Sequence, residues 1–183
     1  MTKELKPYYH RRLPHYQPKD SILFATFRLV NSFPKEIIAQ LHTENDEREK
    51  EIQKETSGEK RRLLTEEKHK RYFGYFDNYL DRVNTEIRWL EHSNIAKLLY
   101  DAILFYNANE YDVIAFCIMP NHVHVLVCLL GTTELESQCT SWKKFSAIGI
   151  NRLLNRRGRF WQEESFDHLV RSPEQFEYLR RYI

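Results

Sequence analysis

Two histidines, His122 and His124, stand two positions apart in the segment MPNHVHVLV. If this segment is a β-strand, alternate side chains point to the same side, and both imidazoles project from one face about 7 Å apart at Cα. Two neutral imidazoles on one face can share a single metal ion. The intervening valines would then point the other way. Imidazoles hydrogen-bonded within a core are the alternative, because a buried polar group needs a partner.

The histidines lie in a region with the composition of paired strands. Residues 111–119 (YDVIAFCIM) and 122–130 (HVHVLVCLL) are apolar and rich in β-branched side chains, with only Pro120-Asn121 between them. A short connection between two such runs predicts an antiparallel pair in the middle of a sheet. Residues 21–29 (SILFATFRL) are predicted to form a further core strand, and residues 166–170 a short one.

Helical patterns separate these strands. Apolar residues recur at helical spacing after Pro34, over residues 93–107 and over residues 135–155. Ser172 followed by Pro173 is typical of the cap and first position of a last helix. The order of elements predicts an α+β fold, which we assign as ferredoxin-like (RRM-like): an antiparallel sheet backed by helices.

A charged segment follows the first predicted helix. Residues 43–70 favour helix and break once, at Ser57-Gly58. This pattern predicts a solvated helical hairpin, and an arm that binds a partner or grips DNA is the alternative. Aromatic side chains crowd residues 72–80, where helical spacing favours packing over base stacking. We expect one domain, residues 1–183, with a helical insertion at about residues 43–92, after the first strand and helix.

Length and composition predict a globular protein. The longest apolar run in the 183 residues falls far short of the roughly 20 residues that a membrane-spanning helix needs. We expect a cytoplasmic protein with no membrane partner. Its three cysteines form no CxxC pair, which favours reduced thiols. The formal net charge is only +2, yet both ends are basic: residues 1–20 hold five basic and two acidic residues, and residues 138–183 hold nine and five.

Several segments together resemble a known family. MPNHVHVLV resembles the histidine-hydrophobe-histidine (HUH) motif of single-strand DNA endonucleases, and specifically of the REP-associated tyrosine transposases, relatives of small single-tyrosine insertion-sequence transposases. Three further blocks look like that family, in the same order and at similar spacing: RYFGYFDNYLD with a following WL, SWKKFSAIGINRLLNRRGRFWQEESFDHLVR, and the closing RRYI. The resemblance runs from about Pro14 to the end of the chain.

This resemblance implies a metal-dependent enzyme that acts through a tyrosine. His122 and His124 match the family's two metal-binding histidines, which hold Mg²⁺ or Mn²⁺ over the scissile phosphate. Tyr182 matches the catalytic nucleophile, and Tyr178, one helical turn earlier, is the other candidate. The family's metal site also includes a polar side chain four residues after the tyrosine, a position beyond Ile183, the last residue of the sequence.

The function implied is that of a single-stranded DNA endonuclease or transposase that nicks and rejoins DNA at hairpin sites, such as those of REP elements, through a 5′-phosphotyrosine intermediate. A catalytically impaired DNA- or RNA-hairpin-binding protein of the same fold is the alternative. We expect single-stranded or hairpin DNA as partner, no small-molecule cofactor, and a monomer in preference to a homodimer. Trp161 is predicted to lie in the core rather than to stack on a base. Arginines that could contact phosphates occur near both ends: Arg11, Arg12, Arg152, Arg156, Arg157 and Arg159.

Overall fold

Two compact units make up the chain in the computed structural model, which describes residues 8–10, 14–16, 18–82 and 86–183. One unit comprises residues 1–30 and 87–183, and the other comprises residues 31–86. None of the helices in the described ranges is both long and apolar enough to span a membrane.

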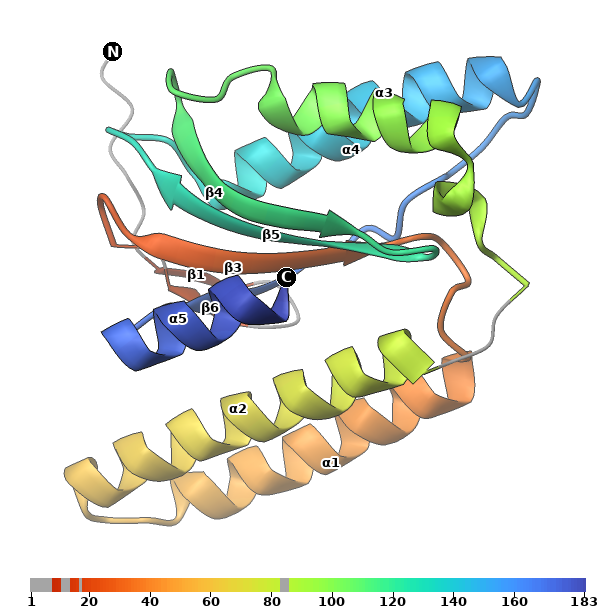
Figure 1. Cartoon of the computed structure of the whole chain (residues 1–183). Helices are drawn as coiled ribbons and strands as arrows, with labels where there is room; N and C mark the ends of the chain where they lie inside the picture. Colours follow the sequence, from red (N-terminus) through yellow and green to blue (C-terminus); the bar gives the residue numbers. More distant parts are fainter. Residues whose placement is uncertain (1–7, 11–13, 17, 83–85) are drawn as a thin grey trace. The chain divides into compact units, whose positions relative to one another are not determined.

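A four-stranded antiparallel sheet is the centre of the first unit (Figure 1). Its strands are β3 (Ile22–Arg28), β4 (Tyr111–Ile118), β5 (His122–Leu129) and β6 (Phe166–Leu169), in the spatial order β4-β5-β3-β6. The first strand of this sheet along the chain therefore lies between the third and the fourth. This order, with helices in the connections, is the ferredoxin-like arrangement that the sequence predicted.

Each central strand alternates between two faces of the sheet. In β3, Leu23, Ala25 and Phe27 belong to the main hydrophobic core. In β5, Val123, Val125 and Val127 belong to the same core. The residues between them, among them Phe24, Thr26, His122 and His124, point to the opposite face, because side chains on a strand alternate. We call this opposite face the histidine face.

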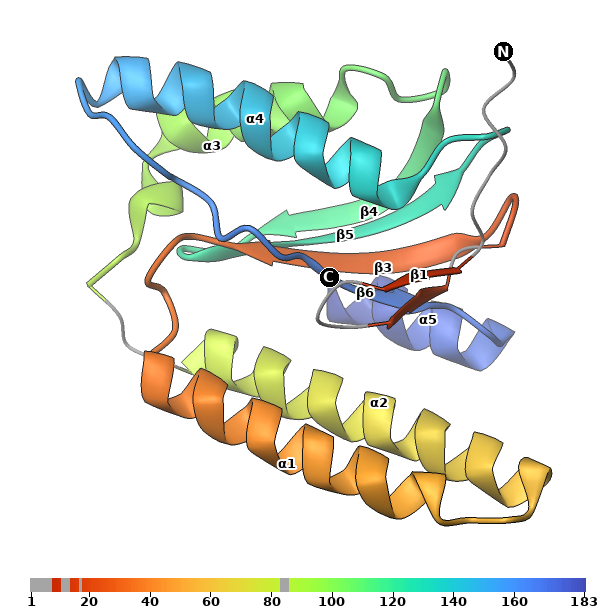
Figure 2. The same cartoon turned by 180° about the vertical axis from the view of Figure 1, so that it is seen from behind.

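Helices cover both faces of the sheet. α3 (Ser93–Leu104) and α4 (Leu135–Leu153) pack on the core face, whereas α5 (Pro173–Tyr182) lies on the histidine face (Figures 1 and 2). Gly149 allows α4 to approach α3 closely, since a Cβ at this position would meet Leu98 Cδ2 at 3.2 Å. A short 3-10 helix, η1 (Trp89–Glu91), precedes α3, and β1 (Tyr8–His10) pairs with β2 (Pro14–Tyr16) in a small sheet that the sequence did not predict.

The second unit is a helical hairpin of α1 (Lys35–Gln53) and α2 (Gly58–Arg82). Its aromatic side chains pack within the unit: the Phe33 ring stacks on Phe76 with centroids 5.0 Å apart and on Tyr79 at 4.3 Å. The compact unit begins at Asn31, before α1, whereas the sequence placed the start of the insertion near residue 43. The sequence boundary followed the change from apolar to charged residues, but the apolar first turns of α1 contribute to the core of the hairpin itself. That the chain is one domain with an insertion stays a prediction.

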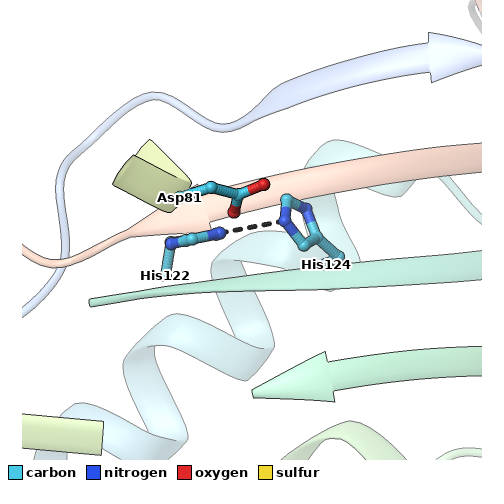
Figure 3. Close-up of side chains that lie close together, drawn as sticks. All are labelled: Asp81, His122 and His124. Atoms are coloured by element: carbon cyan, nitrogen blue, oxygen red, sulfur yellow. Dashed lines mark hydrogen bonds between the residues drawn. The ribbon is translucent and has the colours of Figure 1, made fainter. Parts of the chain in front are cut away.

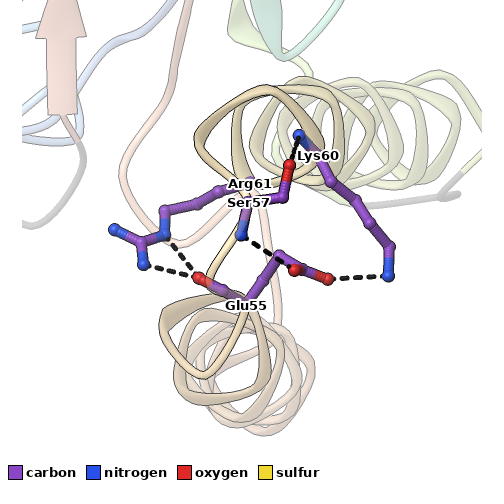
Figure 4. Close-up of polar contacts among 4 residues, drawn as sticks. All are labelled: Glu55, Ser57, Lys60 and Arg61. Carbon is purple, nitrogen blue, oxygen red and sulfur yellow. Dashed lines mark hydrogen bonds and ion pairs between the residues drawn. The ribbon is translucent and has the colours of Figure 1, made fainter.

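The turn between α1 and α2 falls at Ser57-Gly58, as the sequence predicted (Figure 4). Ser57 Oγ accepts a hydrogen bond from the Lys60 backbone N–H at 3.4 Å and so caps the start of α2. Glu55 accepts from the Ser57 N–H at 3.0 Å and pairs with Lys60 Nζ at 2.7 Å. The Lys60 ammonium is the main reason that the pKa of the Glu55 carboxyl lies below its usual value.

A chain of hydrogen bonds crosses the core between the sheet and its two covering helices. Trp142 Nε1 on α4 donates to the Tyr111 hydroxyl at 2.8 Å, and that hydroxyl donates to the Ile103 carbonyl of α3 at 2.7 Å. Both rings are almost fully buried, and burial raises the pKa of Tyr111. One hydroxyl therefore satisfies two polar groups that water cannot reach.

We expect Tyr111→Phe to lower the free energy of unfolding by about 1–3 kcal/mol, because it leaves a buried N–H and a buried carbonyl without a partner. Urea denaturation followed by tryptophan fluorescence measures the change. The control is Tyr106→Phe, at a ring that is 39% exposed, where a surface substitution should cost less than about 0.5 kcal/mol. Equal costs for the two variants would contradict a structural role for the Tyr111 hydroxyl.

Candidate active site

His122 and His124 lie side by side on the histidine face, at the start of β5 (Figure 3). Their Nε2 atoms are 2.9 Å apart, and their ring centroids are 4.6 Å apart with an interplanar angle of 75°. The side chains are 0% and 3% exposed. The alternation predicted for the His-x-His segment is therefore present, and it directs both Nε2 atoms at one point.

The Nδ1 atom of each imidazole lies within hydrogen-bond distance of a side-chain oxygen. Asn121 Oδ1 lies 2.6 Å from His122 Nδ1, and Thr26 Oγ1 lies 3.0 Å from His124 Nδ1. An amide oxygen only accepts, so His122 carries its proton on Nδ1 and has a lone pair at Nε2. The Phe24 ring stacks on the His124 ring at 5.3 Å and fixes its plane.

The geometry of the pair suits a shared metal ion. Two nitrogens that each bind one ion at about 2.1 Å lie about 3.0–3.4 Å apart, close to the separation found here. If the 2.9 Å contact between the Nε2 atoms is a hydrogen bond, His124 Nε2 donates to His122 Nε2, and His124 Nδ1 accepts from the Thr26 hydroxyl. Ligation would require the other tautomer of His124, with Nδ1 donating to Thr26, and the threonine hydroxyl can make either bond.

Tyr182 reaches the same face from the other end of the chain. Its ring centroid is 5.6 Å from that of His124 and 6.4 Å from that of Phe24. The side chain therefore contacts His124, and because it is 37% exposed it also faces solvent. The structure thus brings together the three residues that the sequence proposed for metal binding and nucleophilic attack: His122, His124 and Tyr182.

Local interactions fix the helix that carries Tyr182. Ser172 Oγ accepts from the Gln175 backbone N–H at 3.2 Å and Pro173 occupies the first turn, as predicted. The Gln175 amide donates to His168 Nε2 of β6, and Leu179 is buried. α5 is therefore tied to the edge strand of the sheet at its start and anchored by an apolar side chain near its end.

The predicted phosphate-binding arginines occupy the end of α4 and the turn that follows. Arg156 Nη2 donates to the Arg159 carbonyl at 3.2 Å, and the Arg156 guanidinium lies over the Phe160 ring at 5.5 Å. Arg159 pairs with Glu163 at 3.4 Å, an exposed interaction that contributes little to stability. Arg152 is exposed in the last turn of α4, and Arg157 is exposed in the turn. Arg11 and Arg12 lie outside the described residues.

Burial and contacts also define the surroundings of Trp161 and the three cysteines, for which the sequence made predictions. Trp161 is 4% exposed, and its Nε1 donates to Ser146 Oγ at 2.9 Å, which confirms the core assignment. Cys139 is buried, and burial raises the pKa of its thiol to about 12. It is a free thiol, as are Cys117 and Cys128, in agreement with the sequence prediction.

Sequence reasoning missed the partners of the imidazoles. Thr26 stands directly opposite His124 in the β3–β5 register, and Arg28 stands opposite His122 and is 6% exposed. Both are polar residues at alternate positions of an otherwise apolar strand, a pattern that could have flagged the histidine face. Asn121 adjoins His122 in the sequence, but only its contact with Nδ1 shows that it orients the ring.

Comparison with known proteins relates this arrangement to one family. Residues 82–183 match the family described as "Transposase IS200 like". A solved structure of a REP-associated tyrosine transposase bound to a REP hairpin is similar to the chain, with a TM-score of 0.55 and 15% sequence identity over 100% of this chain and 70% of that one. At this identity the likeness shows the shared fold. None of the curated proteins compared with the chain matches it.

We expect Thr26→Val to weaken binding of Mn²⁺ by about 10- to 100-fold, because the His124 ring loses the oxygen that orients it for ligation. Titration of the protein with Mn²⁺, with the free ion followed by electron paramagnetic resonance, measures the affinity. Thr26→Ser is the matched control, since it keeps the hydroxyl and removes only a methyl group. The proposed orientation is wrong if the valine variant binds Mn²⁺ as tightly as the unaltered protein.

Proposed function

The chain belongs to the IS200-like transposase family, and from this premise we propose that it nicks and rejoins single-stranded DNA at hairpin sites through a 5′-phosphotyrosine intermediate. Membership of the family establishes a transposase-type, DNA-processing function. The observation that carries the finer proposal is the 5.6 Å contact between the rings of Tyr182 and His124, within one compact unit. A nucleophile and a candidate metal-ligating pair therefore meet in a single protomer, which favours a monomer as the acting species.

The proposed reaction exchanges one phosphodiester bond for another. The phenolic oxygen of Tyr182 loses its proton and forms a bond to phosphorus, and the bond from phosphorus to the 3′ oxygen breaks. That oxygen takes up a proton and leaves as a 3′-hydroxyl, while the 5′ phosphate stays on the tyrosine. Because the number of phosphate ester bonds is unchanged, a 3′-hydroxyl can reverse the step and join strands without ATP.

Tyr182 needs help to react near neutral pH, since a tyrosine phenol has a pKa of about 10 and is mostly protonated there. A divalent ion, Mg²⁺ or Mn²⁺, held by His122 and His124 would polarise the scissile phosphate and stabilise its growing negative charge. The protein itself positions the reacting groups. Asn121 and Thr26 orient the imidazoles, and α5 holds the phenol against them at a fixed end of the sheet.

We further propose that the arginines in the last turn of α4 and in the turn that follows bind the DNA backbone. Arg152, Arg156, Arg157 and Arg159 supply four cations within eight residues, and guanidinium groups bind phosphate oxygens well. The similar solved structure is that of a protein bound to a REP hairpin, which supports a hairpin as the DNA partner here.

The decisive experiment is a cleavage assay on labelled single-stranded hairpin DNA with Mn²⁺. We expect a covalent protein–DNA adduct that Tyr182→Phe abolishes, because the ring is kept and the nucleophilic oxygen is lost. The control is Tyr100→Phe, at an exposed tyrosine on α3, on the core side of the sheet. Binding of the hairpin without any adduct would support the alternative function, a hairpin-binding protein that lacks turnover.

Mass spectrometry of the adduct then distinguishes Tyr182 from Tyr178. Trypsin cuts after Arg171, Arg180 and Arg181, so the two tyrosines fall on different fragments. We expect the nucleotide on the fragment that begins at Tyr182. A nucleotide on residues 172–180 would assign the nucleophile to Tyr178 and overturn the proposal.

For the DNA-binding arginines, we expect the combined substitution of Arg156, Arg157 and Arg159 by Gln to weaken hairpin binding and its dependence on salt. Each lost phosphate contact should reduce the slope of log affinity against log salt by about 0.7–0.9. Fluorescence anisotropy at several NaCl concentrations measures this slope. An unchanged slope would show that DNA follows another path over the surface.

A further inference from the structure

Tyr178 is the most exposed large apolar side chain in the described part of the chain, at 66%. It lies one helical turn before Tyr182 on α5, and its ring is parallel to the Tyr182 ring, with centroids 6.2 Å apart and planes 9° apart. The rings of His124, Tyr182 and Tyr178 thus form a continuous series that begins in the buried pair and ends in solvent.

Packing of α5 does not account for this exposed ring. The helix buries Leu179, which is 2% exposed, and a hydrogen bond between Gln175 and His168 ties it to β6. Tyr178 lies between Gln175 and Leu179 in the sequence, yet it keeps two thirds of its surface open to water. A large aromatic side chain kept at the surface, beside a candidate nucleophile, suits contact with a planar ligand.

A positively charged side chain beside the Tyr178 ring indicates which kind of planar ligand fits there. Arg181 is exposed and lies three positions after Tyr178, so the two side chains are neighbours on the helix surface. Arg180, by contrast, is paired with Glu177 at 3.0 Å. An open aromatic ring next to a guanidinium suits a nucleotide, because the base can stack on the ring while the phosphate binds the cation.

We propose that Tyr178 stacks on the base of the nucleotide next to the scissile phosphate and that Arg181 binds the phosphate of that nucleotide. This inference rests on the proposed function, because it takes Tyr182 as the residue that meets the scissile phosphate. Tyr178 and Arg181 then hold the DNA strand in line with the nucleophile. Stacking accepts any base, so this contact positions the strand and leaves recognition of sequence to other contacts.

Binding is measured in the full chain carrying Tyr182→Phe, which keeps the ring and cannot form an adduct. The probe is a fluorescein-labelled DNA hairpin with single-stranded extensions on both sides. We expect Tyr178→Ala to weaken its binding by about 5- to 150-fold, the usual effect of losing one base–aromatic stack. Tyr178→Phe should restore binding to within about twofold, because stacking needs the ring and not the hydroxyl.

A series of probes, each with one abasic site in an extension, locates the contact. At one position the abasic site should remove the difference between the alanine variant and its parent, because the base that stacks is already missing. The control variant is Phe105→Ala, at a ring that is 63% exposed at the end of α3, on the core side of the sheet. It should bind every probe as its parent does.

Three results would overturn the inference: equal binding by Tyr178→Ala and its parent, an equal loss with Phe105→Ala, or a loss that persists with every abasic probe. Failure of the proposed function is seen separately, as the absence of a covalent adduct from the unaltered protein with Mn²⁺. Any of these three results together with a normal adduct on Tyr182 would reject the role of Tyr178 and leave the proposed function standing. If the parent protein binds no probe, both proposals fail.

Discussion

The two-residue period of a β-strand is the constraint on which the candidate site depends. Within β5 it sends Val123, Val125 and Val127 into the core and His122 and His124 to the other face. A shift of register by one residue would place the imidazoles in the apolar core and the valines on the histidine face. The core under α3 and α4 therefore holds the histidines in place, because the apolar contacts that stabilise the sheet also fix the side on which the imidazoles lie.

Orientation of the imidazoles is a second matter, decided by polar contacts. Buried side chains with two nitrogens each must satisfy all of them, and here the two Nε2 atoms meet while Asn121 and Thr26 take the Nδ1 atoms. Because of this network, the two histidines can be almost fully buried without leaving a ring nitrogen unsatisfied. The network also directs both Nε2 atoms at one point, where a shared metal ion could bind.

The terminal helix completes the arrangement from outside the sheet. α5 has a buried Leu179, a hydrogen bond to β6 and a capped first turn, and its Tyr182 ring lies against His124 on the histidine face. Tyr182 lies between the buried His124 ring and water, which is the position that the proposed nucleophile needs. A helix with few buried residues can carry a reactive side chain at a precise place when its two ends are tied to the same sheet.

Local patterns in the sequence determined the elements: the alternation of histidine with valine, the break at Ser57-Gly58, and the Ser172-Pro173 start of α5. These features depend on periods and caps that span a few residues, and the structure confirms them. Only tertiary structure decided that Thr26 meets His124, 98 positions away, that Tyr182 lies against the same ring, and that α1 belongs to the hairpin from its first turn. Such contacts arise from the packing of whole elements, and the order of residues within one element does not encode which other element will cover its face.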